Sequence, residues 1–347
     1  MSQAGGDTGL ERPSRPTIRD VAARAGVSKS LVSLALQNAP RVAPETRELI
    51  LAAAEEIGYR RNAAAHALVA RRTRTIGVFV LDLHNPMTAD VLDAVQAEAR
   101  RRDYRTIVVV GGEDAAAERA ELEKLLEFRV EGILAVGHRL PHGAEEAVSA
   151  DCPAVVLGSA PRGVPHLGSI SNDDVLGAGL AVDHLVGLGH RRIVHIDGGA
   201  SAVADDRRRG YLEAMRRHGL GDLAAVVPGS FSDEGGYRGA RAALGADVPP
   251  TALFVVNDLA AMGALAAVAD AGLAVPGDVS VVGYDGTALA GMRPIGLTTV
   301  GQPLAELGMR AAAHLCGLLD GEAPAEAHAL LRPALVERRT TAPPVGA

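Results

Sequence analysis

The sequence predicts a small all-α headpiece followed by an α/β body of two doubly wound lobes. In the first 60 residues, apolar positions recur at helical spacing between residues that cap helices. From residue 75 onward, short β-branched runs alternate with alanine-rich stretches of helical composition. Strands that are apolar on both faces and alternate with helices form parallel sheets, and these units are numerous enough for two of them.

Charge is distributed unevenly along the chain. The first 74 residues contain 12 Arg and Lys against 7 Asp and Glu, a formal charge of +5, whereas the rest contains 23 against 35, a charge of −12. Phosphates would repel the acidic body, so only the head is expected to contact nucleic acid. The two cysteines, Cys152 and Cys316, show no pairing pattern, which fits a reducing cytoplasm, and no apolar run is long enough to cross a bilayer.

The first helix is predicted over residues 18–25. Thr17 and Asp20 stand three residues apart, the spacing at which a hydroxyl and a carboxylate cap a helix start. Gly26 ends this helix because glycine enters the left-handed region without a steric penalty, and Ser28 provides the cap of a second helix. Two short helices joined by a three-residue turn are what a DNA-binding helix-turn-helix requires.

The second helix is expected to pack Val27, Leu31 and Val32 inward and to present its opposite side to a major groove. The residues of the helix pair that we expect to contact DNA are Thr17, Ser28, Lys29, Ser30, Ser33 and Leu34. The pattern by itself is shared by any amphipathic helix pair with a glycine between the helices, so an alternative without DNA binding stays open at this point.

A third helix is predicted to open at Pro44-Glu45 and to span residues 46–57, with Gly58 closing it. Its expected buried stripe consists of Leu49, Ile50, Ala53 and Ile57. The next stretch, residues 59–72, is alanine-rich, flanked by arginines and weakly apolar. An isolated helix of that length is marginal in water, so we expect it to fold only when DNA and a partner copy hold it.

This order of parts resembles the lactose-repressor (LacI/GalR) family of bacterial transcription regulators. The matching residues are Thr17, Ile18, Asp20, Val21, Ala22, Ala25, Gly26, Val27, Ser28, Val32, Ser33, Val42, Thr46, Arg47, Gly58, Tyr59, Asn62, Ala65, Leu68, Thr75, Ile76, Gly77 and Val78. The resemblance implies a hinge helix that contacts DNA through Asn62, Ala65 and Leu68, with Leu68 wedged into the minor groove. Leu34 stands where family members often carry arginine, which predicts an altered operator half-site.

In the body, strands are predicted at residues 76–81, 106–110, 133–136, 154–157, 193–196, 253–256 and 279–282, and helices near 88–102, 117–128, 175–188, 207–218, 234–244 and 259–271. Polar residues follow the strands, and ligands of such sheets bind beyond the carboxyl ends of the strands. The effector-binding residues that we expect there are Asp82, His84, Asn85, Met87, Ser159, Arg207, Phe231, Asn257, Asp258 and Asp285.

The body also resembles the ligand-binding core of the same family, which is similar to periplasmic sugar-binding proteins. The matches are Asn85-Pro86, Asp173, Gly177, His184-Leu185, residues 189–193, Arg207, Gly210-Tyr211, Asn257-Asp258, Ala261, Gly263, Pro276, residues 278–280, 283–285 and 297–300, and Gln302. By this resemblance the two lobes are joined by three crossings, near residues 171–173, 299–303 and 333.

Arg207 is the strongest effector candidate, because its planar guanidinium offers several donors to hydroxyls or a carboxylate and family members use the arginine of Arg-x-x-Gly in this way. The alternative is a solvated basic helix start, and Arg208 and Arg209 leave the register open. Asp258 and Asn257 are expected to face Arg207, although Asp258 also suits the N-cap of the following helix. Asp285 suits a strand-end turn equally well.

The resulting domain prediction divides the chain into a disordered tail at 1–16, a helix-turn-helix at 17–60, a hinge helix and linker at 61–74, and an effector-binding core at 75–340. Within that core, lobe one covers 75–172 and 303–332, and lobe two covers 173–302 and 333–340. We expect a cytoplasmic regulator, most simply a repressor, that is a homodimer or tetramer and binds operator DNA and a small effector such as a sugar.

Two other classes of protein are weighed against this interpretation. A transport solute-binding protein calls for an export signal, and the N-terminus lacks the apolar segment of one. A Rossmann-type enzyme calls for a glycine-rich phosphate loop after the first strand, where Leu81 to Pro86 stand instead. We therefore expect no enzymatic activity, no cofactor and no metal; His138 and His142 have a metal-like spacing, but Pro141 between them favours a surface loop.

Overall fold

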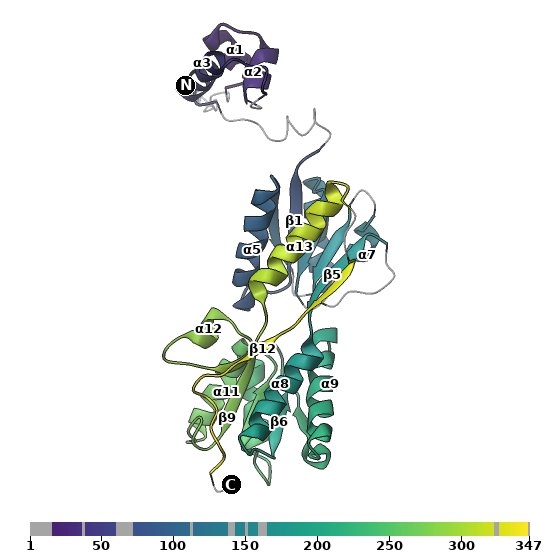
Figure 1. Ribbon diagram of the computed structural model, residues 1–347, viewed down its shortest axis with the longest axis vertical. Coiled ribbons are helices and arrows are strands. Elements are labelled where there is room, and N and C mark those ends of the chain that lie inside the picture. The colour runs from purple at the N-terminus through teal and green to yellow at the C-terminus, as the bar shows by residue number, and fades with distance from the viewer. Residues whose placement is uncertain are drawn as a thin grey trace, which may run out of the picture. The chain divides into compact units, whose positions relative to one another are not determined.

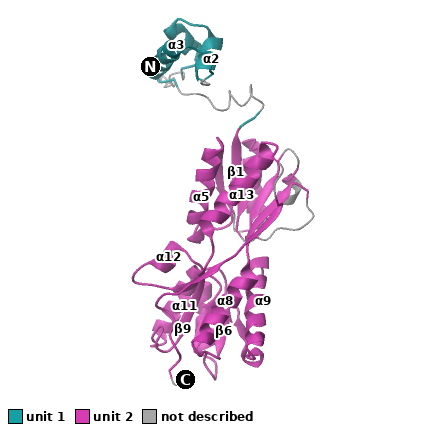
Figure 2. Ribbon diagram, in the orientation of Figure 1, with its two compact units in different colours: residues 1–73 teal, residues 74–347 magenta. Residues whose placement is uncertain are grey.

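The computed structural model describes residues 16–36, 39–59, 72–111, 114–137, 143–149, 152–158, 165–322 and 326–345. The chain divides into two compact units, Met1–Thr73 and Arg74–Ala347 (Figure 2). The predictions for the N-terminal tail up to residue 15, for Asn62, Ala65 and Leu68 of the hinge, for Ser159 and for the His138–His142 loop lie outside the described residues.

The described residues of the first unit form three helices, α1 (Ile18–Ala25), α2 (Lys29–Leu36) and α3 (Pro44–Glu56). Val21, Val32 and Ile50, one from each helix, are completely buried at the centre of this unit. The expected stripe of α3 is wrong at Leu49, which is 54% exposed. The buried face of α3 instead runs through Ile50, Ala53 and Ala54, and Leu49 lies about 100° around the helix from Ile50.

Lobe one of the second unit contains a six-stranded sheet in the order β11-β5-β4-β3-β1-β2, in which all neighbours are parallel. Its strands are β1 (Thr75–Val80), β2 (Arg105–Val110), β3 (Gly132–Val136), β4 (Ala154–Leu157), β5 (Leu167–Asn172) and β11 (His328–Leu331). The helices of this lobe are α5 (Met87–Arg101), α6 (Ala115–Glu127), α7 (Ala144–Ala147) and α13 (Leu304–Leu319). Helix α13 packs along α5 (Figure 1).

Lobe two contains a second six-stranded sheet in the order β12-β10-β9-β8-β6-β7. The strands are β6 (Ile193–Ile196), β7 (Ala225–Val227), β8 (Ala252–Val255), β9 (Ser280–Asp285), β10 (Thr298–Gly301) and β12 (Ala334–Val336), of which only β12 runs antiparallel. The helices are α8 (Asp174–Gly187), α9 (Ala202–Arg217), α10 (Asp233–Leu244), α11 (Asp258–Asp270) and α12 (Ala288–Gly291), with a 3₁₀ turn at Gly221–Leu223.

Both lobes direct the carboxyl ends of their parallel strands toward the boundary between them. The chain leaves lobe one where β5 ends and α8 begins, and it leaves lobe two where β10 ends and α13 begins. A third crossing joins β11 to β12. The carboxyl ends of the parallel strands of both sheets lie at this boundary (Figure 1). The residues that follow these strands in the sequence are therefore placed there.

The predicted architecture, a helix-turn-helix unit followed by two doubly wound lobes, is confirmed. The sequence did not predict strands β5, β7, β10, β11 and β12. Each of these is short or lies at or near a sheet edge, and β5 carries serines at Ser169 and Ser171 in place of a continuous apolar run. In the described part of the chain, no helix combines the length and the apolar character needed to span a membrane.

Candidate functional site

The start of α1 has the capping geometry that the sequence predicts. The Asp20 carboxylate accepts hydrogen bonds from the Thr17 backbone N (2.7 Å) and from Thr17 Oγ1 (2.8 Å), and these bonds lower the pKa of Asp20. Gly26 has φ +68°, so the chain turns in the left-handed region between the two helices. Ser28 Oγ then accepts from Leu31 N at 3.2 Å and begins α2.

The first turn of α2 presents Lys29 and Ser30 to solvent, whereas Ser33 and Leu34 are half-buried. Leu34 contacts the core of the unit, so only part of its side chain is accessible to a base. Arg47 of α3, whose contact the sequence did not predict, donates from Nη2 to the Ala39 carbonyl at 2.7 Å. This bond fixes the segment that follows α2 and thereby supports the helix that carries the candidate DNA contacts.

Arg207 on α9 is the centre of a buried ion cluster in lobe two. Its side chain is 3% exposed, and its guanidinium donates to Asp174 Oδ1 (2.9 Å), to the Val256 carbonyl (2.6 Å) and to Asp285 Oδ1 (3.4 Å). The guanidinium carbon also lies 3.7 Å from the centre of the Tyr284 ring. The alternative of a solvated helix start is therefore wrong for Arg207.

Two glycines bring the helices close enough to form this cluster. A Cβ on Gly210 of α9 would lie 2.3 Å from the Val175 carbonyl oxygen of α8. A Cβ on Gly177 of α8 would lie 2.0 Å from Tyr284 Oη. Because glycine has no Cβ at these two positions, α8 can approach α9 and β9 closely, and Asp174 reaches Arg207.

Asp285 is the last residue of β9 and adopts φ +107°, an unusual conformation for a residue with a side chain. Its carboxylate is 2% exposed and also accepts from Gln302 Nε2 at 2.7 Å. Burial raises the pKa of Asp285 to about 7, although Arg207 opposes the shift. The residue thus combines backbone strain, burial and a perturbed pKa, which are properties that cluster at functional sites.

Asp258 is completely buried, and its carboxylate is fully engaged in lobe two. It accepts from Thr287 N (2.8 Å), Thr287 Oγ1 (2.9 Å) and Thr299 Oγ1 (2.6 Å). Burial raises the pKa of Asp258. The N-cap of α11 is Asn257, not Asp258, because Asn257 Oδ1 accepts from Ala260 N at 2.9 Å. Asp258 therefore links β10 to the start of α12.

Phe231 lies beside the ion cluster. Its ring centre is 5.9 Å from the Arg207 guanidinium carbon, and its carbonyl accepts from Asn257 Nδ2 at 3.2 Å. A Cβ on Gly198 would lie 2.6 Å from the ring, so the turn after β6 packs directly against Phe231. The structure thus brings Arg207, Asp285, Asn257 and Phe231 together at the carboxyl edge of the second sheet.

The candidate residues of lobe one follow β1 at the carboxyl edge of the first sheet. Asp82 Oδ1 accepts from His84 N at 2.8 Å, and Asn85 Oδ1 accepts from Met87 N at 3.1 Å, so both side chains shape this loop. The His84 side chain is 96% exposed, whereas Met87 packs against the core of lobe one. Of these residues, His84 is the most accessible to a ligand.

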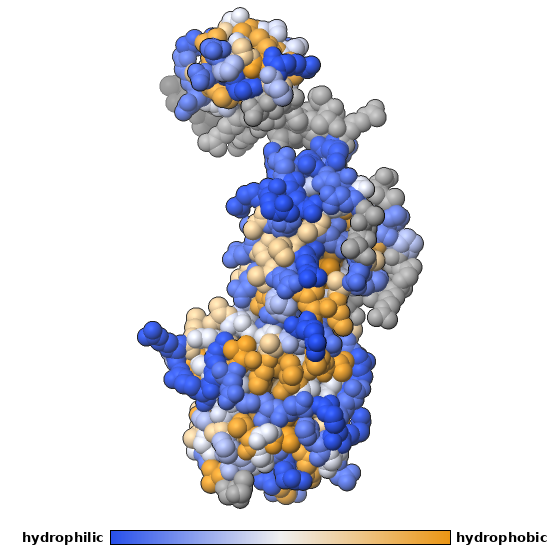
Figure 3. Space-filling model, in the orientation of Figure 1, coloured by the Kyte–Doolittle hydropathy of each residue, from blue (hydrophilic) through white to orange (hydrophobic). Residues whose placement is uncertain are grey.

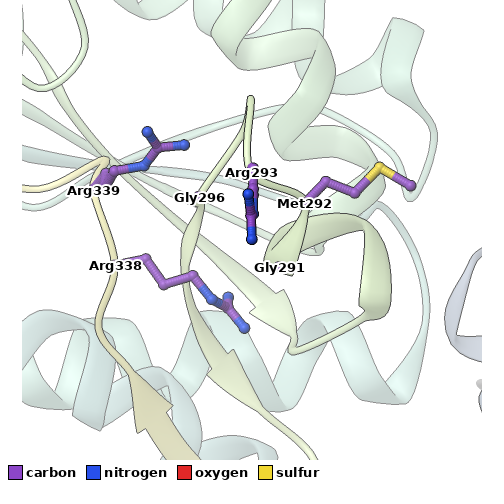
Figure 4. A pocket seen from close by; sticks show the side chains of 6 residues that line it. All are labelled: Gly291, Met292, Arg293, Gly296, Arg338 and Arg339. Atoms are coloured by element: carbon purple, nitrogen blue, oxygen red, sulfur yellow. The ribbon is translucent and has the colours of Figure 1, made fainter.

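Three residues of this region were not among the predicted site residues: Asp174, Tyr284 and Gln302. Asp174 follows Asp173 of a family motif, and Tyr284 and Gln302 belong to two others, so the motifs marked the segments without showing which side chains point inward. A hollow of about 390 Å³ lies elsewhere in lobe two, between α12 and the C-terminal segment, and is lined by Gly291, Met292, Arg293, Gly296, Arg338 and Arg339 (Figure 4). None of the predicted effector residues lines it.

The chain combines a helix-turn-helix unit with a two-lobed α/β body whose lobe boundary is polar. This combination is that of a transcription regulator with an effector-binding core. Residues 17–62 match the family described as bacterial regulatory proteins, lacI family, and residues 182–341 match a periplasmic binding protein-like domain. The HTH-type transcriptional repressor PurR of Edwardsiella ictaluri is 32% identical over 330 residues, which cover 94% of this chain and 97% of PurR. The chain belongs to the LacI family of bacterial regulatory proteins.

Other relatives agree with this assignment. The HTH-type transcriptional repressor CytR of Escherichia coli is 30% identical over 327 residues, which cover 94% of this chain and 96% of CytR. Among solved structures, the lac repressor dimer bound to operator and the anti-inducer ONPF has a TM-score of 0.83 and 31% identity, covering 95% of this chain and all of that one. A LacI transcriptional regulator from a Rhodococcus species has a TM-score of 0.72 and 36% identity over 78% of this chain and 98% of that one. These relatives support a transcription regulator over the transport-protein and enzyme alternatives.

Proposed function

We propose that this regulator is a homodimeric repressor whose operator affinity is set by an uncharged, hydroxyl-rich small molecule bound at the lobe boundary. The observation that carries the proposal is the grouping of Arg207, Asp285, Asn257 and Phe231 at the carboxyl edge of the second sheet. Hydroxyl groups donate and accept hydrogen bonds, so a sugar or a nucleoside suits a guanidinium beside carboxylates. The Phe231 ring offers an apolar face to the flat side of such a molecule.

The charge of the cluster favours an uncharged effector. Asp174 and Asp285 pair with Arg207, and Asp197 pairs with Arg208, so the positive charges of the cluster already have carboxylate partners. An anionic effector would add a negative charge beside these carboxylates, which is unfavourable in a buried site. The bond between Arg207 and Asp285 is the longest of the three that Arg207 makes, at 3.4 Å. When a ligand hydroxyl replaces this bond, the protein loses the weakest of the three hydrogen bonds that Arg207 makes.

The effector changes the relative stability of two arrangements of the lobes, and that change alters operator binding by the helix-turn-helix units of a dimer. Lys29 and Ser30 are proposed to contact base edges, and Leu68 the minor groove at the operator centre. An operator is first selected from a random pool of duplexes. Neutral sugars and nucleosides are then compared with the corresponding sugar acids and phosphates, both for thermal stabilisation of the protein and for their effect on operator binding.

We expect at least one neutral compound to raise the melting temperature and to shift operator affinity, with no response from the anionic counterparts. His84→Ala should weaken the response if lobe one contributes to the site, and Glu123→Ala, a substitution at an exposed position of α6, is the control. A protein that binds its selected operator identically across the whole panel contradicts the effector proposal. A protein without preference among duplexes contradicts the proposed DNA binding itself.

A further inference from the structure

Helix α13 connects the effector cluster of lobe two with the opposite end of lobe one. Its N-terminal end follows Gln302, whose side chain donates to Asp285 and whose backbone N donates to the Asp285 carbonyl at 3.0 Å. Its 16 residues span about 24 Å at 1.5 Å per residue. In Figure 1, α13 runs from the lobe boundary to the end of lobe one at which β1 begins.

The helix is held firmly along its whole length. Leu304, Leu307, Ala311 and Leu315 form one stripe at helical spacing and are all buried in the core of lobe one. A Cβ on Gly308 would lie 2.6 Å from the Val91 carbonyl oxygen, so the backbones of α13 and α5 are in close contact. A close-packed helix of this kind moves as a rigid element, because interiors at this density do not deform continuously.

The far end of α13 holds Arg74, the first residue of the second unit. Asp320, the C-cap of α13, accepts from Arg74 Nη1 at 2.6 Å and from Tyr104 Oη at 3.0 Å. The Arg74 guanidinium carbon lies 4.4 Å from the centre of the Tyr104 ring. Figure 3 shows hydrophilic residues over the end of lobe one that lies away from lobe two, and the side chains of Arg74 and Asp320 are 37% and 27% exposed.

The backbone of Arg74 is fixed as tightly as its side chain. Its N donates to Glu131 Oε1 at 2.7 Å, and its carbonyl accepts from Arg105 N at 2.8 Å. The residue adopts φ +49°, a left-handed conformation that is unfavourable for a residue with a side chain and persists only where surrounding contacts impose it. The direction in which the chain enters β1 is therefore set by α13, β2 and the segment before β3.

We propose that α13 transmits the state of the effector cluster to the point where the linker from the headpiece enters the body, and that Arg74 is the positioning residue at that point. The inference rests on the proposed function. A ligand that changes the Arg207–Asp285 pair acts on Gln302, the displacement passes along α13 to Asp320, and Arg74 turns it into a change in the direction of the linker.

The test is a double-mutant cycle on operator affinity, with no effector present. Gln302→Ala and Arg74→Ala are made separately and together in the full chain, and their affinities for the selected duplex are measured by fluorescence anisotropy at constant salt. Gln302→Ala should change affinity by about fivefold or more, which is the lower end of the range for coupled sites. In the Arg74→Ala background, the same substitution should change affinity by less than about twofold, since the connection is already broken.

Two control substitutions distinguish transmission through α13 from the loss of a positive charge and from a loss of folding. Arg310→Ala removes an arginine of α13 whose ion pair with Glu306 (2.7 Å) lies at the surface, and the effect of Gln302→Ala should persist in that background. Arg74→Lys keeps a cation that reaches Asp320 and should restore most of the effect. Melting curves establish that each variant is folded, and a direct phosphate contact by Arg74 would change affinity without changing the response to Gln302→Ala.

Additive effects of Gln302→Ala and Arg74→Ala would overturn the inference, as would unchanged affinity in Gln302→Ala alone. Both outcomes differ from a failure of the proposed function, in which the unaltered protein shows no preference for any duplex in the pool.

Discussion

Removal of the Arg207 side chain should destabilise the body strongly, because Arg207 is the cation of a buried cluster. Arg207→Ala leaves the Asp174 and Asp285 carboxylates without their ion-pair partner and the Val256 carbonyl without its donor. Loss of one partner of a buried pair costs about 3–5 kcal/mol, a large part of the roughly 5–15 kcal/mol that stabilises a typical folded protein. We therefore expect the free energy of unfolding to fall by about 3–5 kcal/mol.

Urea unfolding followed by far-UV circular dichroism measures this change, since the chain contains no tryptophan to report by fluorescence. Arg209→Ala is the matched control: Arg209 lies on the same helix and is 57% exposed, and its ion pair with Asp206 is local. That variant should change the unfolding free energy by less than about 0.5 kcal/mol. Asp285→Asn added to Arg207→Ala should recover part of the loss. Equal, small losses in Arg207→Ala and Arg209→Ala would refute the buried-cluster argument.

Further predictions concern Asp285, Gly210 and Leu68. The pKa of Asp285 is about 7 in the folded protein against an ordinary value of 3.8, so between about pH 4 and pH 7 only the folded state holds the proton, and stability falls as pH rises through this window. The unfolding free energy of the unaltered protein minus that of Asp285→Asn should therefore decrease up to about pH 7 and then stay level; a flat difference would show an ordinary pKa. Gly210→Ala should cost about 1–3 kcal/mol in urea unfolding because its Cβ meets the Val175 carbonyl, whereas Gly187→Ala, with no atom within 4 Å of the added carbon, should be neutral or stabilising. Leu68→Ala should weaken operator binding in a gel-shift assay without changing the unfolding of the body, and an equal loss of both would show that Leu68 is not a hinge residue.

Much of the fold follows from local chemistry that is visible in the sequence. The caps at Thr17 and Ser28 and the glycine at position 26 fix the boundaries of α1 and the start of α2, because each acts on backbone groups within a few residues. The longer strands of the body are continuous apolar runs, and they lie within a few residues of their predicted positions. Short edge strands such as β7 and β12 have no such signal, since their formation depends on the neighbouring strand.

The candidate site was predictable only as a set of segments. The family motifs contain Arg207, Asn257, Asp258 and Asp285, but they do not show that Asp258 is closed off by Thr287 and Thr299 while Asp285 pairs with Arg207. Asp258 and Asp285 both stand at or just after the carboxyl end of a strand, and they look alike in the sequence. Which of them turns toward a distant arginine depends on how β9, β10 and α9 pack.

The sequence by itself determined the class of protein, a capped helix pair with a basic surface and a two-lobed acidic body, because capping, periodicity and charge are properties of neighbouring residues. Only the tertiary structure decided that Arg207 is an internal ion-pair partner, that the N-cap of α11 is Asn257, and that Arg74 meets Asp320 from 246 positions away. Contacts between residues so far apart in the chain depend on the complete arrangement of helices and sheets, and no local pattern encodes them.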